Sequence, residues 1–260
     1  MTTKERHLPL FRISLAGFLK RGSCWLLLAG MFAFVWLMPL LTPWEEQPQI
    51  LQPARAQAAW MYVWIALLTW IPFQSAVLGR RLRTEGLLEF LKARGSGAGT
   101  LYLQMGMAVA VWLMALVSLA SLFSVAFCSP RDALESRSWL VLVAQYAALL
   151  TIVGVPLSAL GVALGTRAGE VVAYLLPACL LFCGLIAASW LAPLLSANPS
   201  PQLRCLWLLL PHYHLADLTP RLVFKMGALH PAAFWGSLLC LSLQGASLTI
   251  LGRCLIRIRS

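Results

Sequence analysis

The chain has 260 residues, of which 60% are hydrophobic and only 11% are charged, and its mean hydropathy is +0.79. Soluble domains usually carry about 25% charged residues, so this composition excludes an ordinary soluble protein and indicates a membrane protein. The formal net charge is +11. No soluble segment interleaves basic with aromatic residues, so this charge does not indicate nucleic-acid binding.

Residues 1–21 predict a cytoplasmic amphipathic segment, with a helix over His7–Arg21 that lies on the membrane surface. Its apolar positions recur with helical spacing: Phe11, Leu15, Phe18 and Leu19. Neighbouring basic residues can reach lipid headgroups from such a helix. A disordered basic tail is the alternative.

Residues 22–254 predict a transmembrane domain of six helices, because a span needs about 20 apolar residues. The six runs are Gly22–Leu41, Ala58–Gly79, Leu103–Phe127, Trp139–Leu164, Val171–Leu195 and Ala232–Leu251. None of them contains Asp, Glu, Lys or Arg, as burial in lipid requires. Residues 255–260 are expected to form a basic cytoplasmic tail. The fold class is therefore an all-α membrane protein.

The loops between these runs predict the orientation of the chain. The two chain ends and alternate loops hold 14 of the 20 Lys and Arg residues. Cytoplasmic loops carry an excess of Lys and Arg, so both termini and the loop after the second run are expected in the cytoplasm. Pro43–Gln57, Ser129–Ser138 and Ser196–Pro231 are expected on the outer side.

The last outer segment, Ser196–Pro231, is long and still apolar. Leu206–Leu210 could dip into the membrane before Pro211 ends the helix, which would make a re-entrant hairpin. Packing on the outer surface is the equal alternative. Gln74, Gln145 and Gln244 are the strongest polar groups within the runs, and we expect each to form an interhelical hydrogen bond.

A charged segment, RTEGLLEFLKARGSG (Arg83–Gly97), separates the second and third runs. Thr84 suits the N-cap of a helix, Glu85 suits its first turn, and Gly95 suits the C′ position. The apolar residues form one face: Leu87, Leu88 and Leu91, with Phe90 beside them. The pattern predicts a short amphipathic helix that either lies on the membrane or docks into a groove on a cytoplasmic partner.

The residues of this segment resemble the first cytoplasmic loop of type-2 ABC exporter permeases. The resemblance is carried by Thr84-Glu85-Gly86-Leu87-Leu88-Glu89-Phe90-Leu91 and, after a turn, by Leu101-Tyr102-Leu103-Gln104. In that family an acidic residue, Gly-Thr-Leu-Glu and two or three apolar residues form the coupling helix. Leu87 stands here for the usual Thr, and Ala93-Arg94-Gly95 stands where Pro is common. The six-span plan and the segment Leu210–Leu218 are also similar to the family.

The resemblance implies a multi-pass protein of the bacterial inner membrane, the transport subunit of an ATP-driven exporter. Two such subunits, as a homodimer or a heterodimer, would form the pathway within membrane lipid. The sequence has no G-x-x-x-x-G-K-S/T, so ATP is expected on a separate cytoplasmic ABC ATPase, with no cofactor, catalysis or metal on this chain. The residues implied for coupling to the ATPase are Thr84, Glu85, Gly86, Leu87, Glu89, Phe90 and Leu91. Glu85 and Glu89 would make polar contacts, and Leu87, Phe90 and Leu91 would form the anchor.

Three other functions remain open. A metal-dependent membrane enzyme would use His212 and His214 with Asp217 nearby, since His-x-His on a strand places both rings on one face. On a helix the same rings would point about 200 degrees apart. A non-catalytic membrane scaffold would need no ATPase. A secondary transporter often carries ionisable residues inside its spans, and these runs have none.

Overall fold

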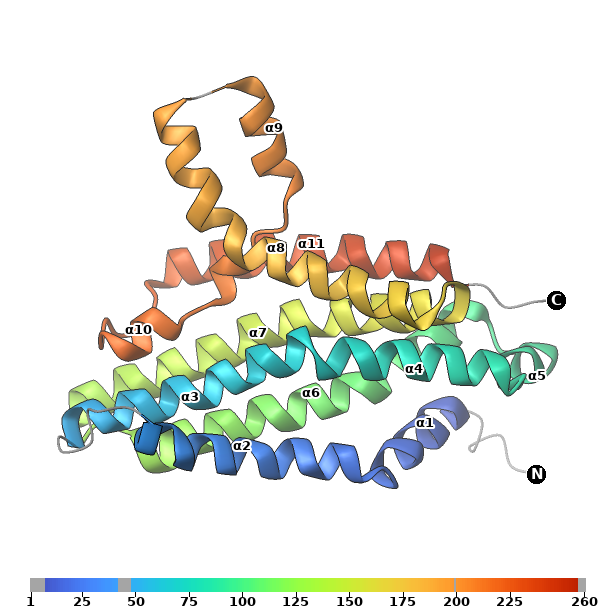
Figure 1. The fold of residues 1–260 in the computed structure, drawn as a ribbon, viewed down its shortest axis with the longest axis horizontal. Coiled ribbons are helices and arrows are strands. Elements are labelled where there is room, and N and C mark those ends of the chain that lie inside the picture. Colours follow the sequence, from blue (N-terminus) through green and yellow to red (C-terminus); the bar gives the residue numbers. More distant parts are fainter. Residues whose placement is uncertain (1–7, 42–47, 199, 257–260) are drawn as a thin grey trace.

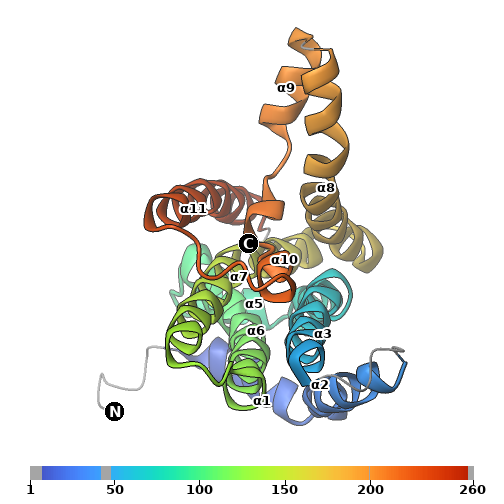
Figure 2. The same ribbon diagram turned by 90° about the vertical axis from the view of Figure 1, so that its left-hand side faces the viewer.

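The structure of the protein is a computed structural model that describes residues 8–41, 48–198 and 200–256, and these residues form helices and no strands. The helices are α1 (Pro9–Leu19), α2 (Gly22–Leu41), α3 (Pro48–Leu68), α4 (Trp70–Thr84), α5 (Leu87–Ala93), α6 (Ala98–Cys128), α7 (Ala133–Arg167), α8 (Glu170–Ala197), α9 (Pro201–Leu209), the 3-10 turn η2 (Tyr213–Ala216), α10 (Thr219–Val223) and α11 (Pro231–Leu255). The long helices lie side by side along the horizontal axis of Figure 1. The second half of α8 and α9 stand out from this bundle as a hairpin (Figures 1 and 2).

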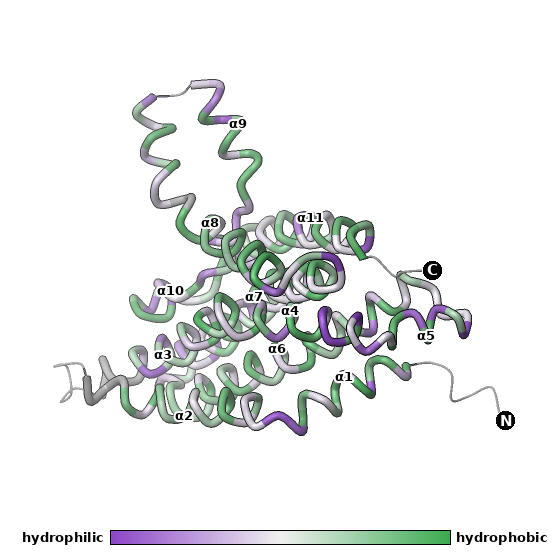
Figure 3. Tube along the Cα trace, turned by 45° about the vertical axis from the view of Figure 1, so that its right-hand side comes forward, coloured by the Kyte–Doolittle hydropathy of each residue, from purple (hydrophilic) through white to green (hydrophobic). Residues whose placement is uncertain are grey.

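Four helical stretches are long and apolar enough to cross a membrane, and two bent pairs raise the number to six if each pair is one span. The four are Pro53–Thr84, Ala98–Cys128, Ala133–Arg167 and Pro231–Leu255; the pairs are Pro9–Leu19 with Gly22–Leu37, bent by 61°, and Glu170–Ile186 with Ser189–Ala197, bent by 48°. In Figure 3 hydrophobic residues, drawn green, predominate along these helices, whereas hydrophilic residues, drawn purple, are frequent around α5. The predicted class, an all-α membrane protein, is confirmed, with four to six spans.

Two predicted outer loops are shorter than expected. Pro43–Gln57 was expected as a loop, but α3 begins at Pro48 and continues through Pro53, while residues 42–47 lie outside the described part of the chain. In Ser129–Ser138 the helix α7 begins early, because the Asp132 side chain accepts hydrogen bonds from the backbone N–H groups of Leu134 and Glu135. Such an N-cap satisfies free backbone donors and stabilises the start of a helix. Residues 1–7, and 257–260 of the expected basic tail, also lie outside the described residues.

The helix α7 lies at the centre of the bundle, against α4, α6, α8 and α11. Of its most apolar 18-residue window, 67% is buried, whereas the corresponding value for α11 is 17%. The closest approach is between α4 and α7. A Cβ on Gly79 would collide with the carbonyl oxygen of Val162, and one on Gly165 would collide with that of Ala76. The two backbones therefore touch, which small residues permit in membrane helices.

This contact predicts that Gly165→Ala destabilises the protein. A methyl group against the carbonyl oxygen of Ala76 forces the helices apart, and overpacking costs about 1–3 kcal/mol in well-packed cores. Thermal unfolding in detergent measures the effect. Gly236→Ala in α11 is the matched control, because nothing lies within 4 Å of that position and the gain in helix propensity is the same. Equal melting temperatures for the two variants would show that α4 and α7 do not touch at Gly165.

Candidate functional site

One end of the bundle gathers most of the positive charge, and we call it the basic end. It contains α1 with the turn after it, α5, the starts of α6 and α8, and the ends of α4, α7 and α11 (Figure 1). Ten of the described Lys and Arg residues belong to these segments: Arg12, Lys20, Arg21, Arg80, Arg81, Arg83, Lys92, Arg94, Arg167 and Arg253. An ion pair joins neighbouring segments there, Arg80 with Glu170 at 3.1 Å. The two side chains are about half exposed, so the pair contributes little to stability.

The helix α5 within the basic end begins later than predicted. Thr84 is the last residue of α4, and its hydroxyl donates to the carbonyl of Arg81, so the prediction of Thr84 as N-cap is wrong. The N-cap is Gly86, whose φ of 66° is a left-handed conformation that glycine adopts at little cost. Glu85 is consequently the C-cap of α4, paired with Arg81, and not a first-turn residue of α5. Glu89 takes that first-turn position, where its charge suits the helix dipole.

The C-terminal end of α5 agrees with the prediction. Gly95 has a φ of 89° and lies at C′. Its N–H donates to the carbonyl of Lys92 at 2.9 Å, and the N–H of Ser96 donates to the carbonyl of Leu91 at 3.1 Å. These two bonds form a Schellman motif, which satisfies carbonyls at the helix end. Two glycines with positive φ therefore bound α5, and its length is fixed by its own residues.

The side chains of α5 divide into an inner and an outer set. Leu88 and Leu91 are buried in the main core, so Leu91 points into the protein and not towards a partner. Phe90 is 49% exposed and lies under the Arg94 guanidinium, 4.3 Å from its ring centroid. Leu87 is partly buried. Of the three predicted anchor residues, Phe90 therefore has the most exposed side chain.

The N-terminal helix α1 packs against protein and is not merely a surface helix. The prediction of a helix is confirmed, but its inward face is Leu10, Ser14 and Phe18. The Gln104 amide oxygen, from α6, accepts hydrogen bonds from the backbone N–H groups of Leu10 and Phe11 at 3.1 and 3.4 Å. A side chain of a membrane span thus caps the N-terminus of α1, a role that sequence reasoning missed because the two residues are 94 positions apart.

Gln74, Gln145 and Gln244 were expected to bond between helices, but each bonds instead to a residue in a segment between two helices. Arg21 donates to the amide oxygen of Gln74 at 3.0 Å. Gln145 exchanges two hydrogen bonds with the backbone of Leu229, at 2.8 and 3.0 Å. The Gln244 amide oxygen accepts from the backbone N–H of His212 at 3.2 Å. Two of the three glutamines therefore fix the long segment between α9 and α11 against the bundle.

A polar network around the buried Tyr146 side chain ties this segment to α3 and α7. The Trp64 indole N–H donates to the Tyr146 hydroxyl at 2.8 Å, and that hydroxyl donates to Asp217 Oδ1 at 3.0 Å. The Thr219 hydroxyl lies 2.7 Å from the same Tyr146 oxygen, and Trp60 stacks on the Tyr146 ring with centroids 4.2 Å apart. Tyr146 lies seven residues inside the uncharged run Trp139–Leu164, which is roughly 10 Å of helix. Asp217 is therefore bound about two helical turns inside this uncharged run, on a residue of a candidate span.

The two histidines of the predicted metal site lie on a 3-10 turn and not on a strand. His212 is the N-cap of η2 and His214 lies within it, with ring centroids 5.7 Å apart. Both rings contact Trp207 of α9. The Nδ1 atom of His212 is 3.2 Å from the Gln244 amide nitrogen. No group of three or more His, Cys, Asp or Glu residues suited to hold a metal occurs within the described ranges.

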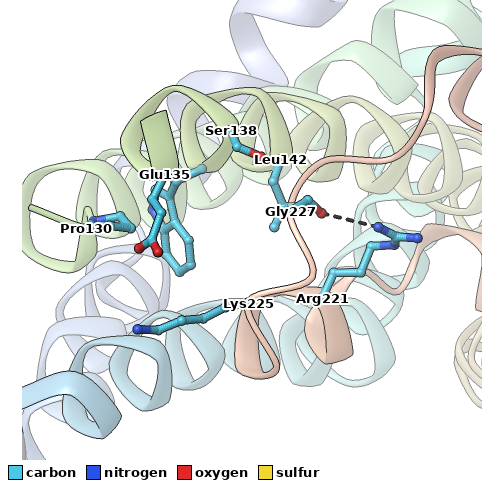
Figure 4. Close-up of a pocket in the computed structure, with 8 residues that line it drawn as sticks. Pro130, Glu135, Ser138, Leu142, Arg221, Lys225 and Gly227 are labelled. Atoms are coloured by element: carbon cyan, nitrogen blue, oxygen red, sulfur yellow. Dashed lines mark hydrogen bonds between the residues drawn. The ribbon is translucent and has the colours of Figure 1, made fainter. Parts of the chain in front are cut away.

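Two hollows lie towards the other end of the bundle. Figure 4 shows the smaller, of about 90 Å³, where Glu135, Ser138, Arg221 and Lys225 line a pocket between α7 and the turn after α10. Arg221 donates there to the carbonyls of Gly227 and Ala228, so its guanidinium holds the turn together. The larger hollow, of about 500 Å³, lies between α3 and the segment from Asp217 to Phe224.

No known family, curated protein or solved structure matches this chain. Its function is therefore inferred from its own residues and their arrangement.

The polar network predicts a measurable role for one hydroxyl. Tyr146→Phe removes the oxygen that links Trp64, Asp217 and Thr219, and leaves one buried and two partly buried groups without this partner. We expect a loss of about 1–3 kcal/mol in the free energy of unfolding. Chemical unfolding in detergent checks this against Tyr174→Phe, a control whose ring packs on Phe73, away from the network. Equal stability of the two variants would contradict the network.

Proposed function

We propose that the chain is the membrane-spanning subunit of an ATP-driven exporter, with α5 as the element that receives force from a separate cytoplasmic ATPase. The observation that carries the proposal is α5 itself. It is a short helix with a defined start and end, it lies at the basic end, and it turns Phe90 outward while Leu88 and Leu91 tie it to the core. A helix of this form can dock into a partner's groove through its exposed aromatic residue.

The distribution of charge supports a cytoplasmic position for α5. Ten Lys and Arg of the described residues belong to the basic end, together with only three acidic residues, Glu85, Glu89 and Glu170. An excess of Lys and Arg close to the ends of membrane helices is typical of the cytoplasmic side. We therefore place the basic end, both chain termini and α5 in the cytoplasm of a bacterial cell, with the protein in its inner membrane.

The packing supports the transmission of a movement of α5 to the long helices. α5 follows α4 after two residues, and α4 touches α7 through its glycine contact. The Arg81–Glu85 pair at the end of α4 lines a pocket together with Ile13, Phe18 and Arg21 of the N-terminal segment. A push on α5 would therefore move α4, and through it α7 and α1, without passing through a flexible linker.

The exposed side of the bundle supports a second permease subunit. Only 17% of the apolar window of α11 is buried, and Trp235, Leu239 and Leu243 are each more than 60% exposed. Such a face requires lipid or protein. In the proposed exporter, a second subunit, identical or related, covers part of this side of the bundle, and the two subunits form the pathway. ATP binds to the ATPase and not to this chain.

The proposal is tested by gentle purification from the native membrane with Phe90→Arg beside the unchanged protein. We expect an ATPase with Walker motifs to co-purify with the unchanged protein, and Phe90→Arg to reduce its amount at least tenfold, because a charge replaces the exposed aromatic contact. ATP hydrolysis by the purified complex should fall in parallel.

The control is Leu134→Arg, which introduces the same charge at a side chain that is 77% exposed in the first turn of α7, at the opposite end of the bundle. It should leave the ATPase bound. Melting temperatures show whether each variant is folded. If no ATPase accompanies the unchanged protein under conditions that preserve other membrane complexes, the exporter proposal is wrong and a non-catalytic scaffold becomes the better interpretation.

A further inference from the structure

The larger hollow, between α3 and the segment Asp217–Phe224, has the composition of a binding site for an amphiphile. Its volume of about 500 Å³ is within the range of small-molecule pockets, about 300–1,000 Å³. Most of its lining residues are apolar, among them Met61, Ile65 and Leu68 of α3 together with Val223 and Phe224. One carboxylate, Asp217, lines the same space.

Within the described residues, only one of the two Asp217 carboxylate oxygens accepts hydrogen bonds. Its Oδ1 atom accepts hydrogen bonds from the Tyr146 hydroxyl and from the backbone N–H of Thr219, both at 3.0 Å. Its Oδ2 atom accepts none from the residues that the structure describes. Because Tyr146 fixes this carboxylate against the apolar candidate span Ala133–Arg167, where an ionised group is costly, a cationic partner at Oδ2 would stabilise it.

The chemistry of the lining selects among possible ligands. Neither Lys nor Arg lines the hollow, so an anionic headgroup would meet only the carboxylate and be repelled. A divalent cation prefers six or more oxygen ligands, and the side chains present offer Asp217, Thr219 and Gln57. An ammonium group needs fewer oxygen partners than a divalent cation, because it can donate to one carboxylate oxygen while its hydrocarbon chain packs on apolar walls.

We propose that this hollow binds a primary alkylamine, with its ammonium group donating to Asp217 Oδ2 and its hydrocarbon chain lying against α3 and α10. The open side of the hollow suits such a ligand: Ile65 is 44% exposed and Phe224 is 74% exposed, so the hydrocarbon chain can leave the site along an exposed apolar surface. The inference goes beyond the exporter proposal and does not depend on it, since it concerns this chain alone.

The experiment uses the purified full chain in phosphatidylcholine nanodiscs, whose quaternary ammonium has no N–H to donate. A dodecylamine with a diazirine in its chain is photolysed with the protein, and the adducts are mapped by mass spectrometry. Unlabelled dodecylamine, dodecanol and dodecanoate serve as competitors. We expect adducts on α3 and on residues 217–224, and competition by dodecylamine at least ten times stronger than by the alcohol or the acid.

Asp217→Asn keeps the side-chain shape and an oxygen for Tyr146 and Thr219, and should weaken competition by dodecylamine at least tenfold. Glu135→Gln removes a carboxylate from the smaller pocket and should leave binding unchanged within twofold. If Asp217→Asn does not fold, Met61→Trp fills the hollow with Asp217 intact and should cause the same loss. Unchanged labelling of these hollow variants, equal competition by dodecanol, or adducts spread over the lipid-facing helices would each overturn the proposal.

Discussion

The backbone contact between α4 and α7 is the constraint on which the rest of this bundle depends. Lipid provides no hydrophobic force that drives helices together, so membrane helices associate through close packing and hydrogen bonds. Gly79 and Gly165 remove the side chains that would keep the two backbones apart. The remaining helices then pack around α7, and α5 is attached to the end of the same α4. The architecture and the proposed coupling element thus share one pair of helices.

A second constraint acts in the other half of the bundle, where polar groups replace glycine. The Tyr146 hydroxyl forms hydrogen bonds with Trp64, Asp217 and Thr219, and Gln145 binds the backbone that leads into α11. Unpaired polar groups are costly in a low dielectric, so a network of this kind holds its members in one arrangement. It fixes an otherwise short and irregular segment beside α3, and the larger hollow exists because that segment stays there.

Uncharged runs of about 20 residues predicted the long apolar helices, four of which could each cross a membrane, or six spans if each bent pair is one, because lipid burial acts on composition directly. The end of α5 was also predictable, since Gly95 at C′ is a local signal. Its start was not: Thr84 and Gly86 both suit a helix boundary, and the choice between them depends on Arg81, which holds Glu85 at the end of α4. The contact of Asp217 with Tyr146 and the cap that Gln104 provides join residues far apart in the sequence, which no local pattern encodes.

The two positive-φ glycines that bound α5 have a mechanical consequence. A helix of seven residues is about 10 Å long. A rotation of about 20° around Gly86 would therefore displace its far end by roughly 3–4 Å, because the geometry of α5 is that of a lever about 10 Å long. Leu88 lies close to Gly86 and Leu91 lies further along α5, and both are buried. Such a rotation therefore cannot occur without moving the core residues that enclose them.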